Sequence, residues 1–180
     1  MSTAQNSVKE GTMSYRGNLI AMMVVILSLL MFVPVAQAER QIIEGISCVS
    51  NTLNTVQGIP NEIYIGSFDG KGIFRSTHEK KFNDNATVHQ VGIQKASKSL
   101  GGFFWSGLFK AVSIDGDYAI WEFSGDTKSG STTSKFIYGT GKFKDAKGEQ
   151  TSKIITSGKP IVEGTNQFCQ QVTGWIELAK

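Results

Sequence analysis

The order of hydrophobic and polar positions divides the chain into two regions. Residues 19–33 form an apolar run that only Ser28 interrupts. From residue 39 onward, short runs of Ile, Val, Phe, Tyr, Trp and Thr recur between polar residues, with Gly and Ser spread throughout. β-Branched and aromatic side chains fit the pleated, half-buried surface of a sheet. The second region therefore predicts an all-β domain.

Nine segments of this second region are predicted to be strands. They cover residues 41–50, 62–68, 72–76, 87–94, 102–113, 117–124, 133–144, 150–157 and 166–178. Turn-forming residues separate the segments. Asp69-Gly70 and Asp115-Gly116-Asp117 each lie between two apolar runs, and this arrangement predicts a tight hairpin at both places.

Alternation within the segments indicates that one face of the sheet covers a core. In residues 117–124, Ala119, Trp121 and Phe123 share one face. In the last segment the more apolar face carries Phe168, Val172, Ile176 and Leu178. A sheet of this size closes into a barrel or splits into two packed layers. We predict a single domain with a small antiparallel β-barrel of about eight strands, with a β-sandwich as the alternative.

The N-terminal region has the features of an export signal. Lys9 and Arg16 precede the apolar run, and Pro34 and Ala36-Gln37-Ala38 follow it. A basic start, an apolar stretch and a small-x-small site together predict a secretory signal peptide over residues 1–38. The domain of residues 39–180 is then expected in the periplasm or outside the cell. An uncleaved membrane anchor is the alternative, although the run is shorter than the roughly 20 apolar residues of a typical span.

Two cysteines, Cys48 and Cys169, lie in the first and last predicted strands. An even number of cysteines in an exported domain predicts one disulfide. Such a bond would bring the two ends of the sheet together, as barrel closure requires, although a Greek-key sandwich could also do so. The charges of residues 39–180 are scattered, which predicts neither nucleic-acid binding nor membrane contact beyond the N-terminal segment.

A family resemblance rests on two glycine motifs. Gly139-Thr140-Gly141-Lys142 follows an aromatic strand, and Asp115-Gly116-Asp117 stands ahead of Tyr118 and Trp121. Over about residues 87 to 157 the chain resembles bacterial exported proteins of the allene oxide cyclase-like barrel group. The resemblance implies an eight-stranded, calycin-like antiparallel barrel with a small interior cavity. The chain departs from the family at residues 145–147, and no catalytic residue of the plant cyclases can be matched, so the resemblance supports the fold and not the activity.

Candidates for catalysis are few. Gly139-Thr140-Gly141-Lys142 lacks the spacing and the helix of a phosphate loop and is interpreted as a glycine-bent strand. His78 is expected in an exposed loop, and two distant histidines do not supply a metal site. His89 would need an orienting carboxylate, for which Glu122 is the candidate. Glu122 itself would be an acid or base only if buried, and we expect it to point outward. No cofactor is predicted.

An aromatic cluster is the strongest indication of function. Its members fall in one predicted hairpin and are candidate ligand-binding residues: Phe104, Trp105, Phe109, Tyr118, Trp121 and Phe123. Aromatic side chains of this kind either fill a barrel core or line a cavity for a small apolar ligand. The sequence favours a non-enzymatic protein that binds such a ligand or a protein partner. An isomerase or cyclase of allene oxide cyclase type and a structural or surface-interaction domain are the alternatives.

Overall fold

The computed structural model describes residues 38–56, 63–97 and 101–179, with the side chains of residues 55 and 56 excepted. The predicted signal peptide lies outside these residues, apart from Ala38. In the part of the chain that the structure describes, no helix is long and apolar enough to cross a membrane.

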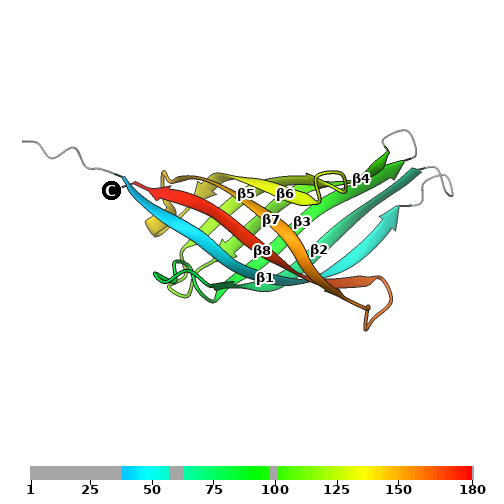
Figure 1. Cartoon of the computed structure of the whole chain (residues 1–180), viewed down its shortest axis with the longest axis horizontal. Coiled ribbons are helices and arrows are strands. Elements are labelled where there is room, and N and C mark those ends of the chain that lie inside the picture. The colour runs from blue at the N-terminus through cyan, green and yellow to red at the C-terminus, as the bar shows by residue number, and fades with distance from the viewer. Residues whose placement is uncertain (1–37, 57–62, 98–100, 180) are drawn as a thin grey trace, which may run out of the picture. The chain divides into compact units, whose positions relative to one another are not determined.

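The described chain forms a closed barrel of eight antiparallel strands (Figure 1). The strands are β1 (Glu39–Val56), β2 (Ile63–Ser76), β3 (Ala86–Ser97), β4 (Gly102–Val112), β5 (Tyr118–Asp126), β6 (Ser131–Gly139), β7 (Lys147–Gly158) and β8 (Thr165–Leu178). Each strand pairs with the next along the chain, and β1 pairs with β8. The predicted β-barrel is therefore confirmed, and the alternative, a β-sandwich, is wrong.

Two local predictions are wrong. Asp69-Gly70 is not a turn, because β2 runs straight through it and joins the predicted strands 62–68 and 72–76 into one. This position of the strand requires a glycine, because a Cβ there would lie 1.8 Å from Asn51 Oδ1. The predicted strand 133–144 is also shorter than expected. β6 ends at Gly139, and Gly141–Phe143 forms a 3-10 turn.

The two glycine motifs meet at one end of the barrel. The Tyr118 amide donates a hydrogen bond of 3.1 Å to Thr140 Oγ1, and the Lys142 amide donates one of 3.0 Å to Asp117 Oδ2. Lys142 Nζ donates to Asp115 Oδ2 at 2.7 Å. Gly141 has a φ of +51°, and a Cβ there would lie 1.8 Å from the Asp117 carboxylate. The motifs therefore act together as a latch that fixes the β4–β5 turn to the 3-10 turn.

A hydrophobic core fills this same end, here called the plugged end. The latch places Phe143 inside the barrel, where only 1% of it is exposed, beside the equally buried Ile176. The remaining buried members of the cluster are Ile43, Phe74, Ala86, Val88, Ala119, Trp121, Ala146 and Val172. The opposite end, here called the far end, carries the turns of residues 127–130 and 159–164.

The disulfide joins the first and last strands, as predicted. Cys48 and Cys169 are direct register partners of β1 and β8, and they are bonded to each other. They alternate with Ser47 and Gln170, which line the interior, so the cysteines lie on the outer face of the barrel. The bond closes a loop across a sequence separation of 121 residues.

Removal of the disulfide is expected to destabilise the barrel strongly. Cys48→Ser/Cys169→Ser should lower the free energy of unfolding by about 3–5 kcal/mol, because a long loop is released in the unfolded state. Urea denaturation of the wild type with and without reductant should show a similar difference. Equal stabilities in oxidised and reduced protein would contradict this expectation.

The latch makes stability depend on pH. The hydrogen bond from Lys142, followed by that from Ser113, lowers the pKa of Asp115 from 3.8 to about 2. Since the folded-state pKa lies below the unfolded one, the stabilisation is present above the ordinary value and is lost between about pH 4 and about pH 2. Asp115→Asn should therefore lose less stability than the wild type across this window in urea denaturation. Parallel losses in both proteins would show that the latch carboxylate does not contribute.

Candidate functional site

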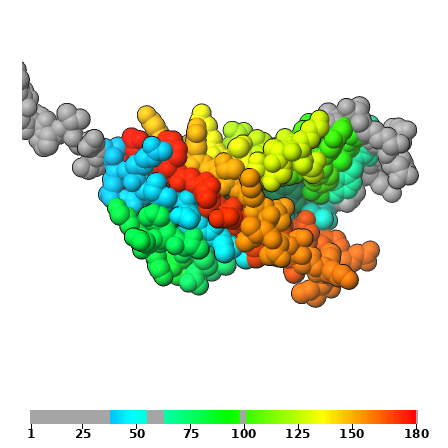
Figure 2. All heavy atoms as spheres, viewed as in Figure 1, coloured from blue at the N-terminus to red at the C-terminus, as the bar shows by residue number. Residues whose placement is uncertain are grey.

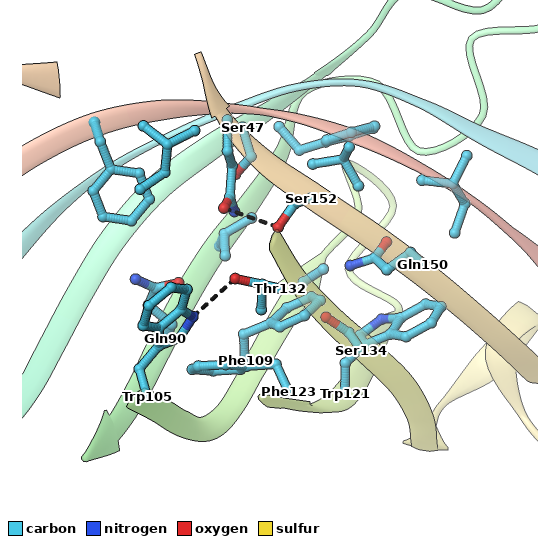
Figure 3. A pocket seen from close by; sticks show the side chains of 18 of the residues that line it. Ser47, Gln90, Trp105, Phe109, Trp121, Phe123, Thr132, Ser134, Gln150 and Ser152 are labelled. Atoms are coloured by element: carbon cyan, nitrogen blue, oxygen red, sulfur yellow. Dashed lines mark hydrogen bonds between the residues drawn. The ribbon is translucent and has the colours of Figure 1, made fainter. Parts of the chain in front are cut away.

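The barrel interior contains a cavity of about 350 Å³. It is lined by all eight strands and by Phe82, Asn83 and Phe143 near the plugged end. Aromatic and neutral polar side chains both face this cavity (Figure 3). In the close-up, Trp105, Phe109, Phe123 and Trp121 lie along one side of the view, with Gln90 and Ser134 beside them, and Ser47, Ser152 and Gln150 lie along the other.

The aromatic wall consists of Phe68 on β2, Trp105 and Phe109 on β4, and Trp121 and Phe123 on β5. The rings of Phe109 and Trp121 are stacked, with centroids 5.9 Å apart and planes 7° apart. Phe123 lies 6.3 Å from Phe109 and 6.1 Å from Phe68, measured between ring centroids. These contacts join the rings of Phe68, Phe123, Phe109 and Trp121 into one surface, and Trp105 instead contacts the Phe103 ring.

Two glycines make room for this wall. Phe68, Gly92, Gly107 and Phe123 are successive register partners across β2 to β5. A Cβ at Gly92 would lie 2.5 Å from the Phe68 ring, and one at Gly107 would lie 3.0 Å from the Phe123 ring. Because neither glycine carries a side chain, both rings can lie against the strands between them. The rings therefore lie over these glycines, along one side of the cavity.

The polar wall is built from uncharged side chains on β1 and β6 to β8. Its members are Ser47, Asn51, Thr132, Ser134, Gln150, Ser152, Asn166 and Gln170. Ser152 Oγ donates a hydrogen bond of 3.0 Å to Gln170 Oε1. Trp105 Nε1 donates one of 2.8 Å to Thr132 Oγ1 and so joins the two walls. Buried polar groups are tolerated when they are hydrogen-bonded in this way.

A glutamine on β3 extends the polar wall across β2. Asn51, Gly70 and Gln90 are successive register partners on β1, β2 and β3. Gln90 Nε2 donates a hydrogen bond of 2.8 Å to Asn51 Oδ1, and both side chains are buried. The bond passes over Gly70, where any side chain would displace Asn51. The glycine that resembles a hairpin signal in the sequence is thus required by this buried contact.

Two lining residues each have a buried acceptor without a hydrogen-bond partner in the described chain, Asn83 Oδ1 and Asn166 Oδ1. Asn166 is the register partner of Asn51 on β8 and belongs to the polar wall. An unsatisfied buried acceptor is costly, on the order of 1–3 kcal/mol. A hydroxyl or N–H group of a molecule in the cavity could satisfy it.

The described residues of the cavity lining include no ionisable side chain. All the polar groups are amides, hydroxyls or the indole N–H of a tryptophan. A charged group is expensive to bury without a counter-charge. The interior is therefore suited to an uncharged occupant.

Four of the six predicted ligand-binding residues face the cavity, and two do not. Trp105, Phe109, Trp121 and Phe123 line it, whereas Phe104 and Tyr118 lie on the outer face of the sheet. Phe104 borders an outer groove with Ile93. Tyr118 contacts the Tyr138 ring at 6.2 Å, and Lys110 Nζ lies 4.0 Å above the Tyr118 ring. Both outward positions follow from strand alternation, which places neighbours such as Phe104 and Trp105 on opposite faces.

The polar lining residues were not identified from the sequence. Serines and glutamines on a strand are usually solvent-facing, so they give little reason to expect an interior position. A usable signal is present in β3, where Ala86, Val88, Gln90 and Gln94 share one face and all are buried. Polar residues in phase with an apolar face indicate a polar patch inside the barrel.

The remaining candidates lie outside the cavity. His89 is on the outer surface, with Nε2 3.2 Å from both carboxylate oxygens of Asp69 and not paired with Glu122. Glu122 is exposed, as expected. His78 is in the loop between β2 and β3, where its Nδ1 accepts a hydrogen bond of 3.3 Å from the Lys80 amide. No group of three or more His, Cys, Asp or Glu side chains in the described chain could hold a metal ion.

Comparison with known proteins gives structural matches alone. No family model and no curated protein matches the sequence. The pterocarpan synthase dirigent protein GePTS1 is 13% identical, with 78% of this chain and 93% of that chain covered and a TM-score of 0.48. The pterocarpan synthase dirigent protein PsPTS1 is 9% identical, with 80% of this chain and 98% of that chain covered and a TM-score of 0.49. The Diels Alderase AbmU from Streptomyces koyangensis is 12% identical, with 92% of this chain and 83% of that chain covered and a TM-score of 0.42. Similarity at this level transfers no activity to this chain.

The contact across Gly70 can be tested by coupled substitutions. Gly70→Ala should lower the free energy of unfolding by about 1–3 kcal/mol, because displacement of Asn51 leaves the Gln90 amide unsatisfied. In an Asn51→Ala background the same change should cost less, with a coupling of about 0.5–3 kcal/mol between the two positions. Urea denaturation of the four proteins measures this coupling. Strictly additive costs would show that Gly70 is not needed for the Asn51–Gln90 contact.

Proposed function

We propose that the protein binds a small, uncharged, largely apolar molecule inside the barrel and performs no proton-transfer chemistry on it. The observation that carries this proposal is the cavity of about 350 Å³ lined by an aromatic wall and by a wall of neutral amides and hydroxyls. Its volume is at the lower end of the range of about 300–1,000 Å³ that is usual for ligand pockets.

The two walls define the chemistry of the ligand. The stacked Phe109 and Trp121 rings and the neighbouring Phe123 offer a broad apolar surface that suits a ring system or a compact hydrocarbon skeleton. The unsatisfied Asn166 Oδ1 favours a ligand with a hydroxyl or N–H group. The lack of ionisable groups in the described lining disfavours carboxylates, phosphates and amines.

The same lining favours binding over catalysis. An isomerase or cyclase that moves a proton needs a positioned acid or base within hydrogen-bond reach of the substrate. His89, Asp69 and Glu122 are on the outer surface, and the described lining offers amides and hydroxyls in their place.

We propose that this binding takes place in the periplasm or outside the cell. The Cys48–Cys169 disulfide is typical of an oxidising compartment. The sequence of residues 1–38 predicts the export that would bring the domain there.

A neutral dye tests the proposal. Nile red fluoresces strongly in apolar surroundings, and its titration should show saturable binding to the wild-type protein. Ser134→Leu places additional side-chain volume in the cavity, since Ser134 is 8% exposed and lines it. This variant, and independently Ser152→Leu, should weaken dye binding at least about tenfold, equivalent to about 1.4 kcal/mol.

The matched control is Ser124→Leu, the same change at an exposed position of β5, the strand next to β6. It should leave dye affinity unchanged, and urea denaturation should confirm that all three variants are folded. Absence of saturable binding to the wild type, or equal affinities for the Ser134 and Ser124 variants, would refute the proposal.

A further inference from the structure

β7 of the β7–β8 hairpin extends past its neighbour β6. β6 pairs with β7 only through residues 132–135 and 149–152, whereas β7 continues to pair with β8 as far as Gly158. Residues 153–158 of β7 therefore have no strand partner on the β6 side, while the β8 residues opposite them stay paired with β1. Figure 2 shows this hairpin, in orange, standing out from the body of the barrel.

The tip of this hairpin presents two aliphatic side chains to solvent. Ile161 is 83% exposed and Val162 is 62% exposed. The turn is held in place, because the Thr165 amide and hydroxyl both donate to the Val162 carbonyl, at 3.2 and 2.6 Å. The Leu53 amide of β1 donates to the Gly164 carbonyl at 2.7 Å. The exposure of Ile161 and Val162 is therefore a feature of an ordered turn.

The base of this hairpin contributes apolar side chains to the cavity. Ile154 on β7 and Phe168 on β8 line the cavity, and Ile154 is also 57% exposed. Ile155, next along β7, is 52% exposed. The hairpin that carries the exposed tip therefore also forms part of the cavity wall.

Lysines accompany these apolar groups. Lys153 on β7 and Lys159, just after β7, are exposed, and Glu163, next to Val162, is the acidic residue of residues 153–164. Aliphatic side chains at a convex tip with flanking lysines match an anionic bilayer surface, where the apolar groups enter the interface and the lysines lie near phosphates.

We propose that the β7–β8 hairpin docks on an anionic lipid surface by inserting Ile161 and Val162. A protein partner that adds a strand to β7 fits less well, since a bulge interrupts the edge between Ile154 and Thr156 and a lysine lies at each end. The tip also lacks the aromatic and arginine side chains that dominate protein interfaces. Docking would bring the far end of the barrel, with Ile154 of the cavity lining, toward the bilayer, and only the relevance of this to the cavity rests on the proposed ligand binding.

Vesicle binding tests the docking. The complete chain is produced in an exporting host, and its intact mass identifies the processed form. Sedimentation is measured with vesicles of phosphatidylcholine and phosphatidylglycerol and with vesicles of phosphatidylcholine alone. We expect binding to the anionic vesicles only. Ile161→Ser/Val162→Ser should weaken it at least about tenfold, and Lys153→Gln/Lys159→Gln should weaken it and reduce its dependence on salt.

Ile114→Ser is the matched control, because Ile114 is 86% exposed on the β4–β5 turn at the plugged end. It should bind vesicles as the wild type does. No binding of the wild type to anionic vesicles, or an equal loss in the Ile114 and the Ile161/Val162 variants, would overturn the proposal. Nile red titration of the same samples separates this result from the proposed ligand binding, since the hairpin variants should keep their dye affinity.

A second readout covers the case in which an uncleaved N-terminal segment holds every variant on the vesicles. Val162→Trp and Ile114→Trp each add one tryptophan to the wild-type emission. Brominated lipids should quench the added emission of the Val162 variant and leave that of the Ile114 variant unchanged. Equal quenching at both positions would overturn the proposal.

Discussion

The pairing of β1 with β8 is the constraint on which the rest of the structure depends. It extends from Glu39 opposite Leu178 to Thr52 opposite Thr165 and converts a sheet with two free edges into a closed barrel. Closure removes the unpaired edges and separates an interior from solvent. The Cys48–Cys169 bond lies within this seam and fixes it covalently. The seam also places Asn51 beside Asn166 and so positions part of the cavity's polar wall.

Closure alone does not make a cavity, because small barrels are usually filled by side chains. Here the plugged end is filled by Phe143, Ile176 and their neighbours. Further along, aromatic rings lie against glycines, and the polar wall carries short side chains bonded to one another. Such a polar interior has a cost in hydrophobic stabilisation. The proposed ligand binding would give a reason for this cost, since function often requires that stability is given up.

The sequence predicts the barrel and most of the aromatic wall because both depend on local patterning, and it predicts the disulfide because the predicted exported domain has only two cysteines. Alternation in residues 117–124 identifies Trp121 and Phe123 as sharing a face, and the register bears this out. The errors have different physical causes. Phe104 faces outward because strand alternation places it opposite Trp105. Gly70 is a turn residue by local rules but a close-contact residue in three dimensions. Tertiary contacts of this kind, like the Asn51–Gln90 bond across a third strand, leave no local trace in the chain.

The central claim is that the folded barrel holds a small uncharged molecule. Native mass spectrometry of the protein, purified from the exported fraction of the organism that makes it, tests this most directly. The account predicts a species heavier than the polypeptide by the mass of one small molecule. That molecule should be released when the protein is unfolded, and after extraction it should prove uncharged. A spectrum that contains only the bare polypeptide, or a bound molecule that carries a carboxylate, phosphate or amine, would contradict the account.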